Sequence, residues 1–161
     1  MAGDRDIELQ SAGVREWGAR TAARGDDPAE LVDYQQAASL RAAIRLFLRR
    51  GENVARSAGL TPQRHLLLLM IKGAPDGSER ATITELVERL QLRQNTVTEL
   101  VMRAEEAGLI MREPAPTDRR SVHLRLSADG ERRLAQTVTA LRGDREHLVH
   151  VIAKQENGDI D

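Results

Sequence analysis

Two short helix patterns joined by a tight turn, with an alternating strand pattern after them, occupy residues 82–126 and restrict the fold more than any other feature. The first helix opens with Thr82-Ile83-Thr84-Glu85, where the threonine and glutamate side chains can each accept a hydrogen bond from the other's backbone N–H. The second is expected over Gln94 to Ala107, after a turn around Gln91 to Arg93. Its apolar residues follow the spacing of one buried stripe, which comprises Val97, Leu100, Val101 and Ala104. Two short helices in this arrangement predict a helix-turn-helix.

The segment after the second helix has the pattern of a β-hairpin. Strands are expected over Leu109 to Arg112 and over Ser121 to Leu126, on either side of a proline-rich segment. In the second strand Val122, Leu124 and Leu126 alternate with polar residues, which predicts one buried and one exposed face. The order helix, turn, helix, hairpin with a long tip is that of a winged helix.

Longer helix patterns flank this region. An N-terminal helix is expected from Asp27-Pro28-Ala29-Glu30, with Asp27 as its cap, to about Ser57. Thr61-Pro62 opens a further helix whose apolar residues cover most of its circumference, so it is expected to be buried and central. Ser127 caps a closing helix, with an interruption expected at Arg142-Gly143-Asp144.

These patterns predict a mainly α fold with a small β-hairpin wing and flanking dimerisation helices. The expected parts are an N-terminal arm (1–27), an N-terminal dimerisation helix (28–59), a winged helix-turn-helix domain (60–127), C-terminal dimerisation helices (128–155) and a frayed tail (156–161). A lone chain would leave the apolar stripes of the flanking helices partly exposed, and a two-fold interface can bury them. The candidate dimer contacts are Leu40, Ile44, Phe47, Leu141, Leu148 and Ile152.

Composition favours a helical core inside the cell. With a single Trp, a single Tyr and a single Phe, the core must be built from Leu, Val, Ile and Ala, which pack well along helices. The lack of cysteine excludes disulfides, thiolate metal sites and cysteine redox switches. The longest apolar run, Leu66 to Ile71, is too short to cross a membrane, and the acidic N-terminus does not resemble a signal peptide. We therefore expect a cytoplasmic protein without membrane contact.

Charge and motif content restrict the partners. A net charge of -1 opposes a nucleic-acid partner unless the positive charge is concentrated at one place. The sequence has no nucleophile elbow, no glycine-rich phosphate loop and no H-E-x-x-H motif, so neither an enzyme nor a cofactor is expected. His147 and His150 lie beside Glu146, but no third strong ligand is placed near them, so surface or dimer-interface histidines are expected instead of a metal site. His65 and His123 are isolated and indicate nothing further.

The hairpin carries the most specific motif of the chain. Asp118-Arg119-Arg120-Ser121-Val122-His123-Leu124-Arg125-Leu126-Ser127 resembles the wing motif D-x-R-x-x-x-L-x-L-[ST] of the MarR-type bacterial regulators. Asn95 to Val101, followed by Gly108-Leu109-Ile110, is similar to that family's recognition helix and the strand after it, and Leu60-Thr61-Pro62 resembles the start of its second helix. The resemblance covers Leu60 to Leu134 closely and implies a winged helix-turn-helix fold.

Candidate DNA contacts lie at the start of the recognition helix and at the wing tip. Short amides and hydroxyls at the N-terminus of such a helix can reach base edges or phosphates in the major groove, and an arginine on a projecting loop can enter a narrow minor groove. The helix candidates are Arg93, Gln94, Asn95, Thr96, Thr98 and Glu99, and the wing candidates are Arg119 and Arg120. Resemblance favours Arg120 as the inserted residue. Asp118 only accepts hydrogen bonds, so it is assigned to fixing the loop.

Two of these positions depart from the family pattern. Members often have a serine where Arg93 stands, and a basic residue where Glu99 stands. A carboxylate near phosphates is repulsive, but it can accept a hydrogen bond from a cytosine amino group, so the preferred DNA sequence can differ from that of relatives.

The resemblance implies a homodimeric transcriptional regulator that binds a near-palindromic double-stranded DNA site, commonly as a repressor. It also implies release by a small-molecule effector bound between the dimer helices and the DNA-binding lobe, although the sequence does not indicate which residues bind it. The alternative is a winged-helix protein-interaction module that does not bind DNA, which the acidic balance and Glu99 favour. Steep weakening of binding with salt distinguishes DNA from a protein partner.

Overall fold

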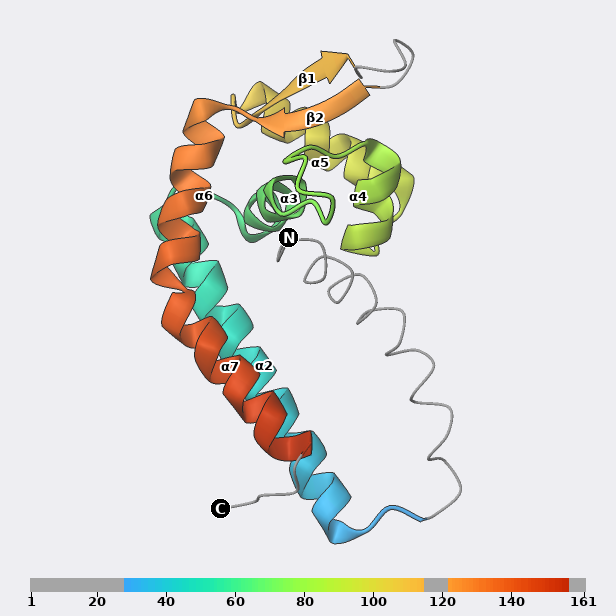
Figure 1. The fold of residues 1–161 in the computed structure, drawn as a ribbon, viewed down its shortest axis with the longest axis vertical. Helices are drawn as coiled ribbons and strands as arrows, with labels where there is room; N and C mark the ends of the chain where they lie inside the picture. The colour runs from blue at the N-terminus through green and yellow to red at the C-terminus, as the bar shows by residue number, and fades with distance from the viewer. Residues whose placement is uncertain (1–27, 115–121, 157–161) are drawn as a thin grey trace, which may run out of the picture.

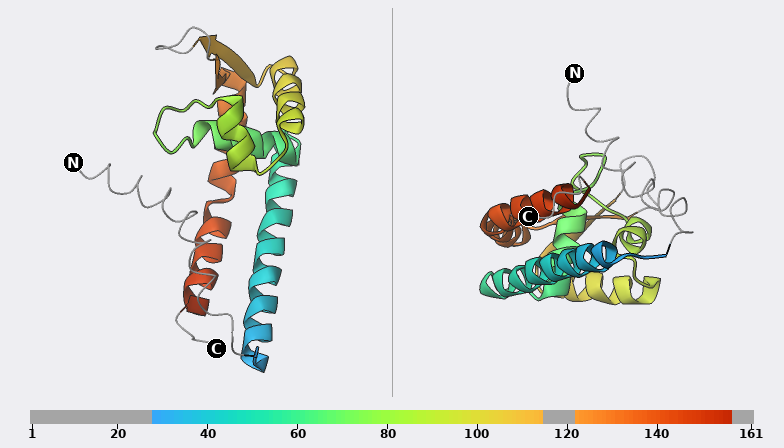
Figure 2. Two further views of the ribbon diagram at one scale, coloured as in Figure 1. Left: turned by 90° about the vertical axis from the view of Figure 1, so that its right-hand side faces the viewer. Right: turned by 90° about the horizontal axis from the view of Figure 1, so that it is seen from below.

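A lobe of short helices and a hairpin lies at one end of a long helical arm in the computed structural model, which describes residues 28–114 and 122–156 (Figure 1). The arm consists of α2 (Leu31–Ser57), α6 (Ala128–Ala140) and α7 (Arg142–Glu156). The lobe consists of α3 (Pro62–Lys72), α4 (Ile83–Leu90), α5 (Gln94–Glu106), β1 (Ile110–Pro114) and β2 (Val122–Leu126). In the arm α2 runs alongside α6 and α7 (Figure 2), and Arg50 Nε lies 2.7 Å from Asp144 Oδ1 across the pair. The predicted class, mainly α with a β-hairpin wing, is confirmed.

The first helix of the arm begins later than predicted. It starts at Leu31 instead of Pro28, because Asp33 Oδ2 accepts a hydrogen bond from the Glu30 N–H at 2.8 Å and fixes the cap there. The expected cap, Asp27, lies outside the described residues. The helix ends at Ser57 as predicted, and Gly59 follows in the left-handed region with φ of 72°.

Helix α3 is central but is not buried all round, which corrects the prediction. Its start is confirmed: Thr61 Oγ1 accepts a hydrogen bond from the Arg64 N–H at 3.2 Å, and Pro62 is the first helical residue. Leu67, Leu68 and Ile71 are fully buried, whereas Leu66 and Leu69 are 41% and 37% exposed. Helices α2, α4, α5 and α6 and strand β2 contact α3, and the two exposed leucines remain on the side that faces the arm and solvent.

Helices α4 and α5 form the predicted helix-turn-helix. The capping box is present, since the Thr82 N–H donates to Glu85 Oε2 at 2.6 Å and the Glu85 N–H donates to Thr82 Oγ1 at 3.3 Å. Gln91 turns the chain in the left-handed region with φ of 53°. The buried residues of α5 are Val97, Leu100, Val101 and Ala104, as the periodicity predicted.

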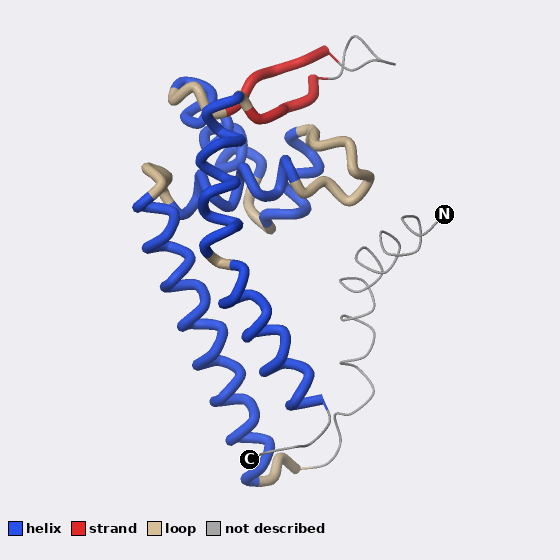
Figure 3. The backbone as a smooth tube through the Cα atoms, turned by 60° about the vertical axis from the view of Figure 1, so that its left-hand side comes forward, coloured by secondary structure: helices blue, strands red, loops and turns tan. Residues whose placement is uncertain are grey.

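The hairpin projects from the end of the lobe that is far from the free end of the arm (Figure 3). Its strands are antiparallel, with Ile110 opposite Leu126 and Pro114 opposite Val122. The first strand starts one residue later than predicted and runs to Pro114, because the Leu109 N–H is bonded to the Ala104 carbonyl in the helix end. The predicted inward face is only partly correct, since Leu124 is buried but Val122 is 43% exposed.

The start of α6 ties the wing to the arm. Ser127 caps the helix as predicted, because its Oγ accepts from the Gly130 N–H at 3.1 Å and donates to the Gly108 carbonyl at 2.6 Å. The Ser127 N–H donates to the Leu109 carbonyl at 2.9 Å. Gly130 packs so closely on this carbonyl that a Cβ placed there would lie 2.1 Å from its oxygen. The closing helix is interrupted at Leu141, immediately before the predicted position.

The hydrophobic core lies in the lobe, and the arm is largely uncovered. Ala55, near its C-terminal end, is the buried residue of α2, and no described side chain of α7 is buried. Large apolar side chains of the arm are exposed, among them Leu31, Tyr34, Leu46, Leu48 and Val149. Within the described ranges, no helix combines the length and the apolar character needed to span a bilayer.

Candidate nucleic-acid interface

The recognition helix α5 presents its predicted polar residues on one solvent-facing surface. The lobe packs against its buried stripe, while the opposite side and the first turn are exposed. All six predicted helix contacts are exposed: Arg93, Gln94, Asn95, Thr96, Thr98 and Glu99. The structure therefore places them together at the N-terminal end of a helix whose opposite face packs against the lobe.

The first turn of α5 leaves backbone donors open to solvent. Arg93 is the N-cap residue, and its side chain makes no cap hydrogen bond. The Thr98 hydroxyl donates to the Gln94 carbonyl at 2.9 Å, so its oxygen retains acceptor capacity only. The positive end of the helix dipole and uncapped N–H groups suit a phosphate oxygen. This end of α5 can thus combine backbone donors with amide and hydroxyl side chains.

Three carboxylates on α5 and the hairpin stem are paired with arginines. The pairs are Glu99 with Arg103, Glu105 with Arg112, and Glu113 with Arg80 and Arg125. The sequence suggested an isolated negative charge at Glu99 on the recognition helix. In the structure this charge is paired with Arg103. The Arg112 Nε lies 3.0 Å from Glu105 Oε2, which links the first strand of the hairpin to the recognition helix.

The stem of the wing is described, but its predicted tip contacts are not. Asp118, Arg119 and Arg120 lie outside the described residues. The two strands that lead to them are firmly placed, because Leu124 and Leu126 are each 1% exposed in the lobe core. Arg112 and Arg125 of the stem were not among the predicted contacts, although the alternation in the second strand indicated that Arg125 faces outward.

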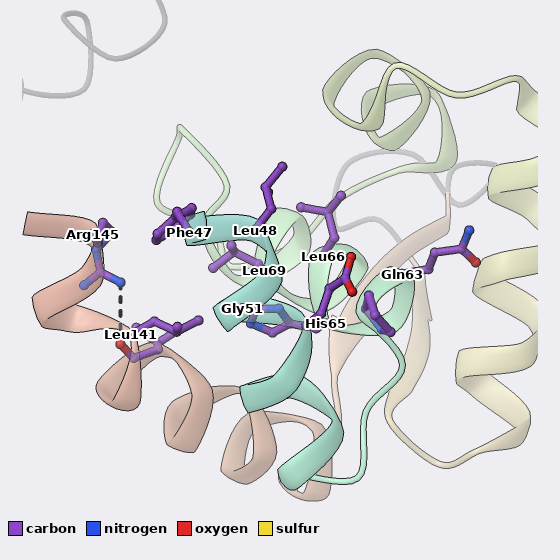
Figure 4. A pocket seen from close by; sticks show the side chains of 12 residues that line it. Phe47, Leu48, Gly51, Gln63, His65, Leu66, Leu69, Leu141 and Arg145 are labelled. Atoms are coloured by element: carbon purple, nitrogen blue, oxygen red, sulfur yellow. Dashed lines mark hydrogen bonds between the residues drawn. The ribbon is translucent and has the colours of Figure 1, made fainter. Parts of the chain in front are cut away.

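A pocket of about 510 Å³ lies where the arm meets the lobe (Figure 4). Helices α2, α3, α6 and α7 contribute its lining, which is mostly apolar and includes Phe47, Leu48, Leu66, Leu69 and Leu141. Its polar members include Gln63, His65 and Arg145. The buried His65 Nε2 has no hydrogen-bond partner in the described part of the chain, and burial lowers the pKa of this imidazole. The pocket has no signal in the sequence, because the four helices meet only in the folded chain.

The other predicted residues are distributed along the arm. Leu40, Ile44, Phe47 and Leu148 are half-buried and Ile152 is 40% exposed, so each keeps surface in the single chain. Leu141 is only 5% exposed, because the chain turns it inward against α2 at the helix break, so little of its surface remains for a partner. His147 and His150 are exposed on α7, and the described residues include no cluster of three side chains able to hold a metal ion.

A short helix pair with a hairpin stem beside its second helix defines a winged helix-turn-helix protein. The chain matches the MarR family over residues 58–121. It is 27% identical over 139 residues to a Thauera aromatica protein named as a candidate transcriptional regulatory protein for the hcr operon, covering 83% of this chain and 81% of that protein.

AbsC and a mutant of MarR are among the solved structures that share the fold. AbsC is a MarR family transcriptional regulator from Streptomyces coelicolor, with a TM-score of 0.61, 18% identity and coverage of 83% of this chain and 99% of AbsC. The other is a mutant of MarR from E. coli complexed with operator DNA, with a TM-score of 0.60, 18% identity and coverage of 80% of this chain and 95% of that chain.

Proposed function

We propose that this protein binds double-stranded DNA in a sequence-specific manner and regulates transcription as a homodimer, as a repressor on a near-palindromic site. The observation that carries the proposal is the exposed, uncapped first turn of α5 beside a hairpin stem that leads to Arg119 and Arg120. A helix start of this kind fits the major groove, while an arginine-bearing wing fits the adjacent minor groove. The operator complex of the E. coli relative supports the same role.

Local charge supports DNA as the partner despite the net charge of -1. Glu99, Glu105 and Glu113, on α5 and the wing stem, are already paired with arginines, so they repel phosphates less than free carboxylates do. Arg93 at the helix start has no ion pair among the described residues, and the sequence between the two strands contains two further cations, Arg119 and Arg120. Local potential, more than total charge, governs binding to a polyanion.

A fluorescence anisotropy titration tests this proposal on fragments selected from the source genome by binding. Affinity should fall steeply as salt rises, because bound phosphates release counterions. Asn95→Ala should weaken binding by about 5- to 150-fold if the amide makes a bidentate base contact. Gln136→Ala, which removes an exposed amide on α6, is the matched control and should leave the affinity unchanged. Arg120→Ala should reduce the salt slope by about one.

Two results would reject the proposal. One is the absence of affinity for any genomic fragment in dilute buffer. The other is a polar face of α5 that binds a protein partner without steep salt dependence, as a winged-helix protein-interaction module would. Equal losses of DNA affinity in Asn95→Ala and Gln136→Ala would reject only the base contact assigned to Asn95 on α5.

The homodimer is proposed from the uncovered arm. Large apolar side chains on α2 and α7 are exposed in the single chain, and a second copy of the same arm can bury them. Val149→Glu places a charge in this surface, where the side chain is 62% exposed in the single chain. We expect the variant to shift to a monomer in analytical ultracentrifugation, while Gln136→Glu on α6 leaves the assembly unchanged.

Release by a small molecule is proposed for the pocket between the arm and the lobe. Its volume lies in the range of small-molecule sites, and its lining is mostly apolar with a few polar groups. A ligand there contacts α2 and α3 together, so it can change how the lobe sits on the arm. Anisotropy of the bound duplex, measured while candidate molecules are added, tests release directly.

A further inference from the structure

Two covalent connections join the lobe to the arm. One is residues 58–61, which lead from α2 into α3, and the other is Ser127, which leads from β2 into α6 (Figure 1). Residues at the ends of helices are where domains turn relative to one another, so the position of the lobe on the arm depends on how these connections are held.

Arg133 of α6 holds the first connection. Its Nη1 donates to the Gly59 carbonyl at 3.2 Å and to the Ala58 carbonyl at 3.4 Å. Both carbonyls follow the last turn of α2, where the end of a helix carries unpaired acceptors and the negative end of the dipole. A guanidinium is therefore well suited to this place, because it supplies both positive charge and N–H donors.

The side chain of Arg133 is fixed by an ion pair of its own. Its Nε lies 2.7 Å from Asp129 Oδ2, one turn earlier in α6. Hydrogen bonds from Arg132 and Arg133 lower the pKa of Asp129, so this carboxylate stays charged. The two arginines differ in their other contacts: within the described ranges, the hydrogen bonds and ion pairs of Arg132 go to Asp129 alone. Arg133 is thus the arginine that links α6 to the end of α2.

The second connection is bonded to the segment that follows the recognition helix. The Ser127 hydroxyl donates to the Gly108 carbonyl at 2.6 Å, and the Ser127 N–H donates to the Leu109 carbonyl at 2.9 Å. Gly108 comes two residues after the end of α5. A continuous series of polar contacts therefore runs from the end of α2, through Arg133 and the first turns of α6, to the C-terminal end of α5.

We infer that Arg133 is a positioning residue, which fixes the angle between the recognition helix and the arm and thereby the spacing of DNA half-sites that the protein accepts. This inference rests on the proposed function, in which two copies joined through their arms each present one α5 to DNA. The two recognition helices must then match half-sites about 34–36 Å apart. A duplex with a different spacing is bound only if a lobe turns on its arm, and that turn breaks the Arg133 hydrogen bonds.

Fluorescence anisotropy on the bound duplex, and on the same duplex with base pairs inserted between its half-sites, tests this role. The ratio of the two dissociation constants measures the selectivity for spacing. In Arg133→Met this ratio should fall by about 3- to 10-fold, as expected when a turn of the lobe no longer breaks a partly exposed hydrogen bond from a charged donor. A general loss of affinity or of folded protein affects both duplexes alike and cancels in the ratio.

Arg132→Met is the matched control for this measurement. It makes the same change at the adjacent position of α6 and removes the other partner of Asp129, but Arg132 does not contact the end of α2. Both variants lose one positive charge, so their attraction for phosphates should fall alike. The spacing ratio in Arg132→Met should equal that of the wild type.

A distance measurement tests the positioning role without DNA. The chain contains no cysteine, so spin labels can be attached at Arg49→Cys in α2 and Met102→Cys in α5, which are both exposed positions. Labelled chains are diluted with unlabelled protein, so that electron paramagnetic resonance reports the distance between arm and lobe within one chain. The distribution of this distance should widen when Arg133→Met is added and stay unchanged when Arg132→Met is added.

Unchanged widths in both variants would overturn the inference, and so would equal widening in both. A spacing ratio in Arg133→Met equal to that of the wild type would also overturn it. If DNA binds with steep salt dependence but either of these results is found, the inference fails alone. If no duplex binds, the proposed function fails, while the distance measurement still decides whether Arg133 holds the lobe on the arm.

Discussion

Gly130 provides a test in which backbone packing and helix propensity predict opposite results. It lies in the first turn of α6, where an added Cβ would be 2.1 Å from the Leu109 carbonyl oxygen and 3.1 Å from its carbonyl carbon. Propensity alone predicts that Gly130→Ala stabilises the helix by about 1 kcal/mol. Packing predicts a loss, because the same oxygen already accepts the Ser127 N–H at 2.9 Å and neither segment can move away freely.

The magnitude follows from the displacement required. The Cβ must withdraw from 2.1 Å to at least 3.4 Å to reach ordinary contact, and overpacking of this kind costs about 1–3 kcal/mol. Weakening of the Ser127 hydrogen bond adds about 1 kcal/mol, which offsets the gain in propensity. The net expectation is a loss of about 1–3 kcal/mol, or roughly 2–12 °C in Tm for a chain of this size.

Thermal and urea unfolding, followed by circular dichroism at one protein concentration, measure this loss. The concentration must be fixed because assembly changes the apparent stability. Gly51→Ala and Gly143→Ala are matched controls: a Cβ at Gly51 meets only Leu141 Cδ1, at 3.9 Å, and one at Gly143 meets nothing within 4 Å. Both should gain up to about 1 kcal/mol. A Gly130→Ala protein as stable as these two controls would refute the reasoning.

Three further predictions concern stability. Burial lowers the pKa of His65 below its ordinary 6.5, so its neutral form contributes stability that is present above that pH and is lost as the pH falls towards the folded-state pKa. Between about pH 7.5 and 5 the urea midpoint should therefore fall less in His65→Leu than in the wild type, and equal declines would contradict this. Thr82→Ala should cost about 0.5–2 kcal/mol through the lost cap of α4, whereas Thr84→Ala in the same helix should cost nothing measurable; similar values for both would exclude the capping explanation. Lys72→Ala should cost less than about 1 kcal/mol in denaturant titrations, because its ion pairs to the loop and to α6 are exposed, and a larger loss would show that they act as a buried network.

Local chemistry made much of the lobe predictable from sequence. The threonine and serine caps at Thr61, Thr82 and Ser127 act within three or four residues, so the starts of three helices were predicted correctly. The stripe on α5 was predicted for the same reason, since helical periodicity alone defines it. The start of α2 was missed because either Asp27 or Asp33 could cap the helix. In the fold Asp33 accepts the hydrogen bond from the Glu30 N–H.

Features that depend on which segments meet were not predictable. Periodicity placed Leu66 and Leu69 on a helix that is apolar all round, but only the arrangement of neighbours leaves them exposed beside a pocket. The close approach of Gly130 to Leu109 joins segments about twenty residues apart, and no local pattern records it. An isolated histidine such as His65 carries no positional signal in the sequence, so its role in the pocket required the fold.

Helix α3 separates two tasks by its geometry. Leu67, Leu68 and Ile71 anchor the lobe that supports the recognition helix, while Leu66 and Leu69 point the other way, towards the pocket. On the proposed function, exchange of the two outward leucines would retune which small molecule is sensed and leave operator reading intact. Such a division allows descendants of one ancestor to acquire new chemical signals while they keep their target genes.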